Sequence, residues 1–368
     1  MALTLARLVE ALRLCGWVVS VVRPRQQSDS EQHRADANLL LVGGVPLPRY
    51  PGLQLGLPAA KRLRRRWTER PPSAVYVATE GLLGLSAVRA ARRLGIPVFS
   101  GFHTNFHSYS DHYRVGWLAS LIFRYLCWFH RGTAGTVVAS ADVRSRLHAA
   151  GLGNVHVVGR GVDRQLFSPA HRSRALRSQW GVSDGDLVAI TVGRIAPEKN
   201  LDLAIAAYRA MQGATRTSRL VLVGDGPARA ELQGRHRDLI FSGLQTGEDL
   251  ARHYASADVF LFPSETDTFG NVTLEAMASG LAVVAYDYAA AHQHVTHGHT
   301  GRLAPLGNEE AFVAEAIIVA RELEALPRMR RSAREHVASL DWQRIAERFA
   351  TLLSGDVKRA GAASADAA

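Results

Sequence analysis

The sequence predicts an α/β protein with two doubly wound domains, each built on a parallel sheet covered by helices. Short apolar runs rich in β-branched residues alternate with amphipathic stretches along almost the whole chain. This pattern is typical of buried parallel strands joined by crossover helices. The alternation falls into two blocks separated by a polar segment at 163–179, which indicates two domains rather than one barrel. A length of 368 residues agrees with two domains.

The first block contains six predicted strands and four predicted helices. The strands are Trp17–Val22, Asn38–Val42, Ala74–Ala78, Pro97–Phe99, Thr136–Ala139 and Val155–Val158. The helices lie near residues 2–14, 84–94, 114–130 and 141–150. A doubly wound domain normally opens with its central strand and a Gly-rich turn, whereas this sequence opens with a helix. We therefore expect the first N-terminal strand to be missing and the chain as written to be poorly stable and weakly active.

The second block repeats the alternation. Its predicted strands are Leu187–Val192, Leu220–Val223, Leu239–Phe241, Val259–Phe262 and Ala282–Ala285, and its helices lie near residues 200–211, 226–234, 247–255 and 271–279. We place the first domain at 1–165 and the second at 166–340. An amphipathic helix at 341–354 is expected to pack back toward the first domain. The Ala/Gly-rich tail at 355–368 is expected to be disordered.

Composition excludes several classes of protein. Two cysteines cannot build a disulfide framework, and they favour a reducing cytoplasm. The longest apolar stretch, Val115 to Phe129, is interrupted by Arg124 and is too short to span a bilayer. Charged residues within the first apolar run argue against a secretory signal.

Positive charge is concentrated in the first half of the chain. Residues 1–170 carry 22 Lys and Arg against 9 Asp and Glu, while residues 171–368 carry 22 against 24. This asymmetry predicts that the first domain faces an anionic partner. Nucleic acid, an anionic membrane and phosphorylated substrates are the candidates at this point.

The first motif with chemical content is Gly193 to Asn200, between a strand and a helix. Arg194 and Lys199 are expected to be exposed at the carboxyl edge of the sheet, where ligands bind in open α/β folds. Two cations beside helix amino ends suit a diphosphate leaving group. The alternative is ordinary solvated loop charge.

The second motif runs from Phe262 to Gly280, where a strand enters a polar loop and then a short helix. Gly270 permits close backbone approach, and the amides of Gly270, Asn271 and Val272 point out of the helix start. Asp267 and Glu275 are carboxylates suited to paired hydroxyls, as in a sugar or ribose. The alternative for Glu275 is a salt bridge within the helix.

Together these motifs resemble the retaining family-4 glycosyltransferases of GT-B fold, whose two domains face a cleft. The family carries an Arg and a Lys after the first strand of its C-terminal domain and then a Glu-x7-Glu motif. Here the pair is Arg194 and Lys199, and the motif reads Asp267-x7-Glu275, shorter by one methylene at its first position. The turns at 159–163 and 223–227 also look like the family.

The resemblance assigns a role to each domain and motif. The first domain would bind the acceptor and the second the nucleotide-sugar donor. Arg194 and Lys199 would stabilise the departing diphosphate, Asp267 would position the sugar, and His103, after a first-domain strand, would contact the sugar. Donor binding would further involve Glu275, on the ribose hydroxyls, and the segments containing Gly193, Gly224, Gly270, Asn271 and Val272. His107 and Tyr109 are more ambiguous.

The segment His103 to Phe106 and the run Thr268 to Val272 resemble GDP-mannose-dependent α-mannosyltransferases and sulfolipid synthases. The resemblance therefore favours a mannose donor and a lipid or glycolipid acceptor. A UDP-sugar donor, a catalytically impaired binding module and a nucleotide-sugar epimerase of the same fold are the alternatives.

No cofactor or metal is expected. His292, His294, His297 and His299 lack neighbouring cysteines and helical spacing for a metal site, and the family is generally metal-independent. The third glycine of a dinucleotide fingerprint is replaced by Arg229.

The basic run from Lys61 to Trp67 and an aromatic stretch at 117–129 predict binding to an anionic membrane surface. A solvated helix face and a buried core are the respective alternatives. No zinc-finger, RNP or basic-zipper motif is present, which argues against nucleic acid. We therefore expect a cytoplasmic enzyme bound peripherally to the inner face of the membrane.

Overall fold

A computed structural model describes residues 2–27, 29–31, 36–47, 54–103, 116–214, 217–267 and 270–365. The chain divides into two compact units. Unit 1 comprises Met1–Gly159 and Gln343–Ala368, and unit 2 comprises Arg160–Trp342. These boundaries lie close to the 165 and 340 expected from the sequence, and the C-terminal segment is grouped with the first unit.

The described residues of unit 1 form two parallel sheets and one antiparallel pair of strands. Its strands are β1 (Val21–Pro24), β2 (Leu39–Val42), β3 (Gly44–Pro46), β4 (Gln54–Gly56), β5 (Val75–Val77), β6 (Val98–Gly101), β7 (Gly135–Val138) and β8 (Val155–Val157). The orders are β1-β2 and β5-β6-β7-β8, both parallel, while β3 and β4 pair antiparallel. The antiparallel pair was not predicted, because strands of three residues give no readable alternation.

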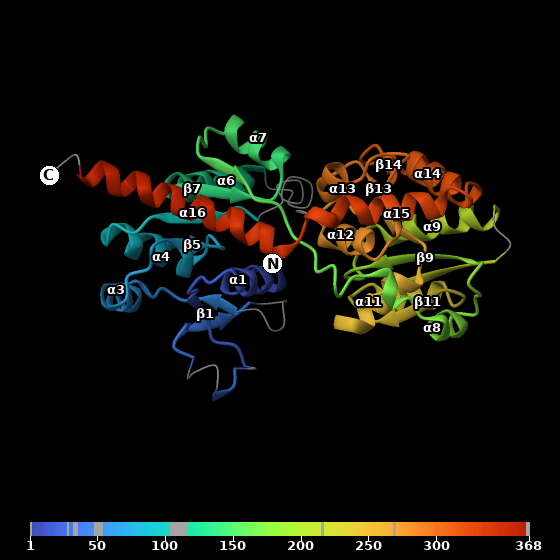
Figure 1. Cartoon of the computed structure of the whole chain (residues 1–368), viewed down its shortest axis with the longest axis horizontal. Coiled ribbons are helices and arrows are strands. Elements are labelled where there is room, and N and C mark those ends of the chain that lie inside the picture. The colour runs from blue at the N-terminus through green and yellow to red at the C-terminus, as the bar shows by residue number, and fades with distance from the viewer. Residues whose placement is uncertain are drawn as a thin grey trace. The chain divides into compact units, whose positions relative to one another are not determined.

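The helices of unit 1 are α1 (Ala2–Leu14), α3 (Ala60–Glu69), α4 (Leu82–Arg93), α6 (Gly116–Arg131), α7 (Ala141–Ala149) and the part of α16 (Trp342–Ala365) that follows Trp342 (Figure 1). In α16, the Phe349 ring packs edge-on against Tyr76 of β5, with ring centroids 4.9 Å apart. The helix extends to Ala365, so the tail expected to be disordered from Gly355 is instead largely helical. Alanine, the strongest helix former, dominates that tail.

Helix α3 contains the basic run from Lys61 to Trp67, and its apolar side chains face the core. Trp67 is buried together with Leu63, so the aromatic end of this run belongs to the core. Arg62 donates to the Leu41 carbonyl at 2.8 Å and Arg66 to the Ala37 carbonyl. Two arginines of the basic run therefore hold neighbouring backbone, while Lys61, Arg62 and Arg65 are exposed, and binding of this run to a membrane stays a prediction.

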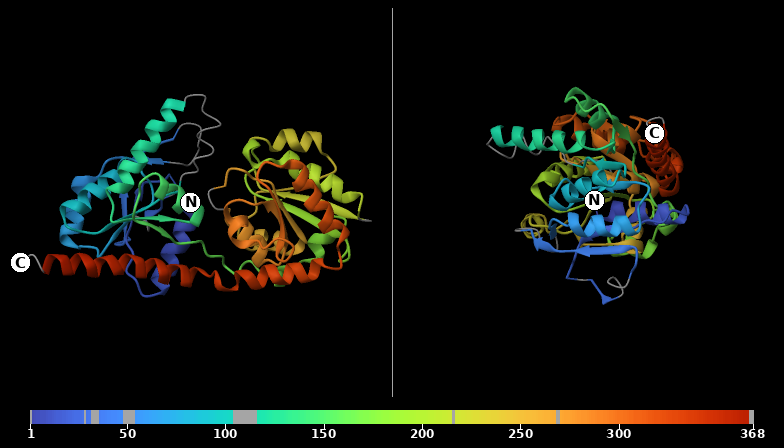
Figure 2. Two further views of the ribbon diagram at one scale, coloured as in Figure 1. Left: turned by 90° about the horizontal axis from the view of Figure 1, so that it is seen from above. Right: turned by 90° about the vertical axis from the view of Figure 1, so that its left-hand side faces the viewer.

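Unit 2 contains one six-stranded parallel sheet. Its strands are β9 (Leu187–Val192), β10 (Ser218–Val223), β11 (Ile240–Gly243), β12 (Val259–Phe262), β13 (Ala282–Tyr286) and β14 (Gly301–Ala304), in the order β11-β10-β9-β12-β13-β14. Helices lie on both faces of the sheet (Figure 2). They include η1 (Pro169–His171), α8 (Arg174–Gln179), η2 (Pro197–Lys199), α9 (Leu201–Gln212), α10 (Arg229–Arg235), α11 (Gly247–Ser256), α12 (Asn271–Ala278), α13 (Ala289–His294), α14 (Glu309–Arg321), α15 (Leu326–His336) and η3 (Val337–Ser339). The doubly wound α/β prediction is confirmed.

The chain order reverses between β9 and β12, which are neighbours in the sheet. Every residue of β9 and β12 is buried, so their apolar β-branched and aromatic side chains fix both strands in the middle of the unit. The loops that follow β9 and β12 therefore emerge side by side at the carboxyl edge, where open α/β sheets bind ligands.

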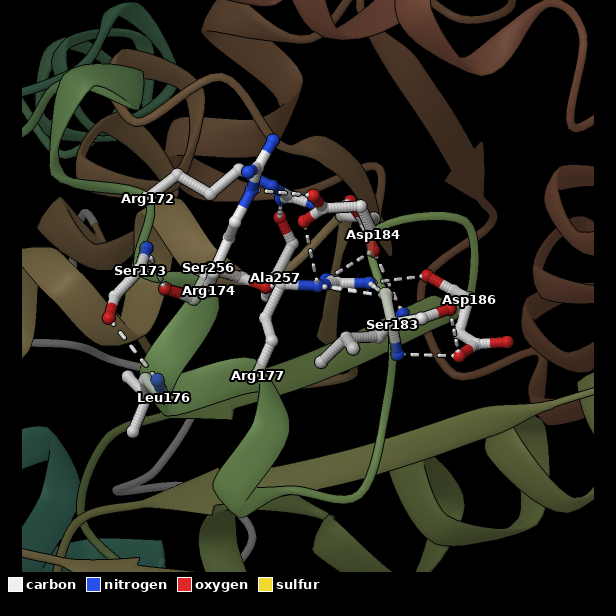
Figure 3. A network of polar contacts seen from close by, with 12 residues as sticks. Arg172, Ser173, Arg174, Leu176, Arg177, Ser183, Asp184, Asp186, Ser256 and Ala257 are labelled. Atoms are coloured by element: carbon white, nitrogen blue, oxygen red, sulfur yellow. Dashed lines mark hydrogen bonds and ion pairs between the residues drawn. The ribbon is translucent and has the colours of Figure 1, made fainter.

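A buried charge network lies at the opposite, amino edge of the same sheet (Figure 3). The Asp258 carboxylate, just before β12, pairs with Arg172 at 3.1 Å, Arg177 at 3.2 Å and Arg330 at 2.8 Å. It also accepts the Val188 amide at 3.0 Å. Asp258 and Arg177 are 4% and 1% exposed, whereas the Arg172 and Arg330 side chains are 26% and 23% exposed, so the centre of the network is dry and its outer arginines reach solvent.

Three arginines on one carboxylate leave excess positive charge, and backbone carbonyls compensate for it. Arg172 donates to Ala255 and Ala257, and Arg177 donates to Ser256 at 2.7 Å. These carbonyls belong to the carboxyl end of α11, which carries partial negative charge. Arg330 similarly donates to the Gly280 carbonyl at 2.7 Å, just after α12. The network thus joins the segment before β9, α15 and the amino edge of the sheet.

Candidate functional site

The loops after β9 and β10 are locked together through glycine backbone. Gly193 donates its amide to Val223, and Ile195 donates to Asp225 at 2.9 Å. A Cβ on Gly224 would lie 1.8 Å from the Gly193 carbonyl oxygen, and Gly224 itself has φ +140°. Only glycine fits this position. The close approach fixes the backbone on either side of Arg194.

Arg194 extends from this loop toward solvent. Its guanidinium pairs with Glu198, four residues later, at 3.1 Å, and its side chain is 52% exposed. An exposed pair at this spacing contributes little to stability. The Arg194 guanidinium can therefore exchange its carboxylate for an anionic ligand at small cost.

Lys199 ends the short helix η2, after β9, and reaches the loop after β12. Its Nζ pairs with Asp267 at 2.8 Å and donates to the Ser264 hydroxyl at 3.4 Å. The Lys199 side chain is only 20% exposed, so the expectation that both cations are exposed is wrong for Lys199. Lys199 and Asp267 were each candidate site residues from the sequence. Their direct contact was not predicted, because the two residues are 68 positions apart.

Helix α12 begins at Gly270, whose φ of +81° lies in the left-handed region that favours glycine. Asn271 and Val272 form the first turn and are half-buried. The first amides of a helix have no acceptor within it and carry partial positive charge. This end of α12 therefore offers donors beside the Lys199–Asp267 pair, since Asp267 lies in the loop that leads to it.

Glu275 lies inside α12 and accepts a hydrogen bond at 3.1 Å from the Tyr254 hydroxyl of α11. Burial raises the pKa of Glu275 to about 7, and the Tyr254 hydrogen bond opposes this shift. Burial, followed by the nearby Glu275, raises the pKa of Tyr254 well above its usual value. Glu275 is therefore a half-buried carboxyl group that gains a proton near neutral pH.

The described residues also enclose a small pocket at this edge, lined by residues of β9 and β10 together with Arg194, Lys199 and Phe262. The Lys199 ammonium lies 6.0 Å from the centroid of the Phe262 ring. A cation held against an aromatic face and a carboxylate is partly shielded from water, which strengthens its action on a bound anion.

His103 follows β6 in unit 1. Its Nε2 lies 3.2 Å from the Tyr76 hydroxyl, and both side chains pack over Gly101, where a Cβ would meet the Tyr76 oxygen at 2.1 Å. Tyr76 thereby fixes the orientation of the imidazole at the carboxyl edge of this sheet. His107, Tyr109, Thr268 and Phe269 lie outside the described residues.

Within the described ranges, no group of three or more His, Cys, Asp or Glu side chains has the arrangement of a metal site. Of the histidines considered from the sequence, His292 pairs with Asp287 at 2.7 Å. His297 accepts the Leu303 amide at 3.1 Å. Both act as partners of the local fold.

Three residues that contact the candidate site residues were not identified from the sequence. Tyr254 carries no motif that links it to Glu275, 21 residues away. Ser264 and Glu198 lie inside the motifs but had no assigned role. Their position within a strand-end loop was a usable signal, because polar side chains there face the same edge.

Two protein-family models together match most of this chain. The model for "Glycosyltransferase Family 4" matches residues 1–166, and that for "Glycosyl transferases group 1" matches residues 186–322. A GDP-mannose-dependent alpha-mannosyltransferase of Mycobacterium tuberculosis (strain CDC 1551 / Oshkosh) is 34% identical over 342 residues, covering 92% of this chain and 88% of the relative. A sulfoquinovosyl transferase of Arabidopsis thaliana is 30% identical over 344 residues, covering 91% of this chain and 66% of the relative.

Among solved structures, sucrose-phosphate synthase from Thermosynechococcus elongatus superposes with a TM-score of 0.79 at 20% identity. The match covers 96% of this chain and 92% of the synthase.

Proposed function

The chain belongs to glycosyltransferase family 4, with the GT-B fold, and is a hexosyltransferase; from this premise we propose that it moves mannose from GDP-mannose to a lipid or glycolipid acceptor. The names of three relatives favour this donor, since each is a GDP-mannose-dependent alpha-mannosyltransferase, 31–34% identical. An alpha-monoglucosyldiacylglycerol synthase of Streptococcus pneumoniae, 28% identical over 225 residues, favours a lipid acceptor.

One observation carries the assignment of the donor site. Arg194, Lys199 and Asp267 occupy the loops after β9 and β12, the neighbouring strands at which the chain order reverses. A nucleotide diphosphate at this edge lies between two cations and the start of α12. The departing diphosphate carries negative charge that grows as the glycosidic bond breaks. Preorganised cations stabilise that charge more in the transition state than in the bound donor.

The remaining residues hold the rest of the donor. Glu275 accepts the two ribose hydroxyls, for which its ionised form is suited because it offers only acceptors. Asp267 and the amides of Gly270, Asn271 and Val272 position the sugar, and His103 contacts the sugar from unit 1. The Gly193 and Gly224 loops keep the backbone close to the diphosphate.

We assign retention of the anomeric configuration by displacement on one face of the sugar. This assignment follows the resemblance to the retaining family-4 enzymes. At the edge of unit 2 the Ser264 hydroxyl accepts a hydrogen bond from the Lys199 ammonium at 3.4 Å, and an ammonium that donates in this way does not activate a nucleophile by taking its proton. Asp267 is likewise engaged by Lys199. The acceptor hydroxyl then attacks the face from which the diphosphate departs.

We also place this reaction at the inner face of a membrane, in the cytoplasm, without a bound metal or cofactor. Cys15 and Cys127 are both free thiols, which fits a reducing compartment. In the described part of the chain, no helix has an apolar stretch long enough to cross a bilayer.

A donor screen with product analysis tests the proposal. The full chain is incubated with GDP-mannose, UDP-glucose or UDP-galactose and a membrane lipid extract, and labelled lipid, free sugar and epimerised donor are separated. We expect α-linked mannolipid from GDP-mannose alone. Transfer only from a UDP-sugar would reject the donor assignment, and epimerised donor without transfer would reject the reaction.

A further inference from the structure

Helix α6 exposes three large apolar side chains on one face. Leu121, Tyr125 and Trp128 are 48%, 39% and 55% exposed. Their spacing of four and then three residues places them in one row along the helix. The Tyr125 and Trp128 rings lie 5.9 Å apart. We call this row the α6 patch.

The opposite face of α6 anchors the helix in the core. Leu126, Cys127, Phe129 and His130 are all at least 94% buried, and α6 projects from the rest of unit 1 in both views (Figure 2). The His130 ring is held by Ser100 at 2.8 Å and by Glu80 at 3.2 Å. The α6 patch is therefore an outward face on a firmly seated helix, not a frayed end.

The surroundings of the α6 patch are basic. Arg124 is exposed on the same helix, and Arg89, Arg92 and Arg93 are exposed on α4. Neither helix contains an Asp or Glu. Arg89 also acts on the Tyr125 hydroxyl, where it opposes burial and Glu80, which together raise the pKa of Tyr125. Exposed aromatic rings beside exposed arginines suit the headgroup region of an anionic bilayer.

Tyr125 links the α6 patch to the carboxyl edge of the sheet in unit 1. Its hydroxyl donates to the Glu80 carbonyl at 2.5 Å, and Glu80 follows β5 directly before α4. The same edge carries His103 after β6. A surface seated on the α6 patch therefore lies beside the edge at which an α/β domain binds its ligand.

We propose that the α6 patch docks this enzyme on an anionic lipid surface, with Trp128 and Leu121 entering the headgroup region and Arg124 and Arg89 facing lipid phosphates. This inference rests on the proposed function for its lipid acceptor, but the docking itself does not depend on the donor. A second copy of the chain is the less suitable occupant, because two such patches would bring like charges together.

Vesicle binding of the full chain tests the proposal. Wild type is sedimented with phosphatidylcholine vesicles that contain or lack phosphatidylglycerol, and compared with the double variant Leu121→Ser/Trp128→Ser. We expect wild type to bind only the anionic vesicles, with binding lost at high salt. The double variant should lose about tenfold or more in partitioning, and Arg89→Gln or Arg124→Gln about fivefold each. Tyr125 is left intact because its hydroxyl holds Glu80.

Matched controls come from unit 2. Leu244 and Leu323 are also exposed, at 72% and 41%, and Arg237 is exposed, so Leu244→Ser/Leu323→Ser and Arg237→Gln should bind vesicles as wild type does. GDP binding by calorimetry reports separately on the donor site and should be unchanged in every variant. Equal vesicle binding by wild type and Leu121→Ser/Trp128→Ser overturns the proposal. Wild-type dimers that the double variant dissociates also overturn it, in favour of self-association.

Discussion

The two edges of the sheet in unit 2 each hold a carboxylate against cations, but in opposite environments. At the amino edge, Asp258 is 4% exposed and contacts three arginines. These arginines also donate to carbonyls at helix ends and, from Arg177, to the loop carbonyls of Ser183 and Asp186. At the carboxyl edge, Asp267 meets one lysine, and both side chains are about one-fifth exposed. The two carboxylates differ in solvent access, since the Asp258 side chain is 6% exposed and the Asp267 side chain 21% exposed. Among the cations only Arg177, 1% exposed, is more deeply buried than Lys199.

This difference separates a structural network from a binding site. Removing a partner from a dry network leaves an uncompensated buried charge, which costs several kcal/mol. In a partly solvated pair such as Lys199–Asp267, the cation can leave its carboxylate for a ligand, because water and the ligand replace the lost partner. The amino edge therefore holds the unit together, and the carboxyl edge is free to act on a substrate.

The largest expected effect is on stability, at the amino edge. Asp258→Asn removes the carboxylate that Arg172, Arg177 and Arg330 share, leaving Arg177 only the half-exposed Asp184 at 4.0 Å. We expect the free energy of unfolding of unit 2 to fall by about 3–5 kcal/mol. Urea unfolding followed by circular dichroism measures this loss. Asp238, paired with Arg209 but 59% exposed, is the control, and Asp238→Asn should cost no more than about 1 kcal/mol. Equal losses in the two variants would remove the distinction between buried and exposed pairs.

The next effect is on catalysis, at the carboxyl edge. Lys199→Ala removes a cation from the departing diphosphate, and we expect turnover to fall by about 10²- to 10³-fold. The free energy of unfolding should change by no more than about 1 kcal/mol, because the Lys199–Asp267 pair is partly solvated. Arg235→Ala, at an exposed pair with Asp202, is the control and should keep wild-type turnover. Near-normal turnover of Lys199→Ala would contradict the role assigned to Lys199.

The smallest expected effect is the pH dependence of donor binding. Glu275 must be ionised to accept two hydroxyls, and its pKa in the free protein is about 7. Nucleotide affinity should therefore fall about tenfold between pH 8 and pH 6. Glu275→Gln should bind more weakly at pH 8 and lose this dependence. Calorimetry with GDP at the two pH values measures both results, and an unaltered pH dependence in Glu275→Gln would show that another group titrates.

The same pKa has a consequence for stability with a definite sign. Because the pKa of Glu275 is raised from 4.5 to about 7 in the folded protein, folding favours its protonated form. Its contribution to stability is therefore greatest below pH 4.5 and is lost as pH rises through 7. Glu275→Gln should be more stable than wild type at pH 8, with little difference at pH 4, by thermal unfolding. A variant less stable than wild type at pH 8 would contradict the raised pKa.

The sequence predicted the parts of the fold that depend on buried apolar runs. The six residues of β9 and the four of β12 are wholly apolar or β-branched and wholly buried, so their pattern is legible. By contrast, β14 has only the residues Gly, Arg, Leu and Ala and gives no strand signal. Helix α8 lies in a polar segment that we interpreted as a connection, because its packing comes from the buried Arg177 rather than from an apolar face.

For the candidate site, the sequence predicted which motifs lie near one another but not which side chains touch. Strand ends of a parallel sheet meet at one edge, so the motifs at Arg194 and Asp267 could be placed near each other without coordinates. The direct Lys199–Asp267 contact and the Tyr254–Glu275 hydrogen bond depend on side-chain packing between distant segments. The Asp258 network joins residues 72 to 86 positions apart and carries no local pattern at all.

Hydrogen–deuterium exchange with and without GDP tests the contrast between the two edges most directly. We predict slower amide exchange at 193–196, 224–226 and 270–273, the loops and helix start of the carboxyl edge. Amides at 172–186, beside the Asp258 network, should exchange at the same rate in both states. Bound GDP that slows exchange at 172–186 but leaves the carboxyl-edge amides unchanged would contradict the placement of the donor site.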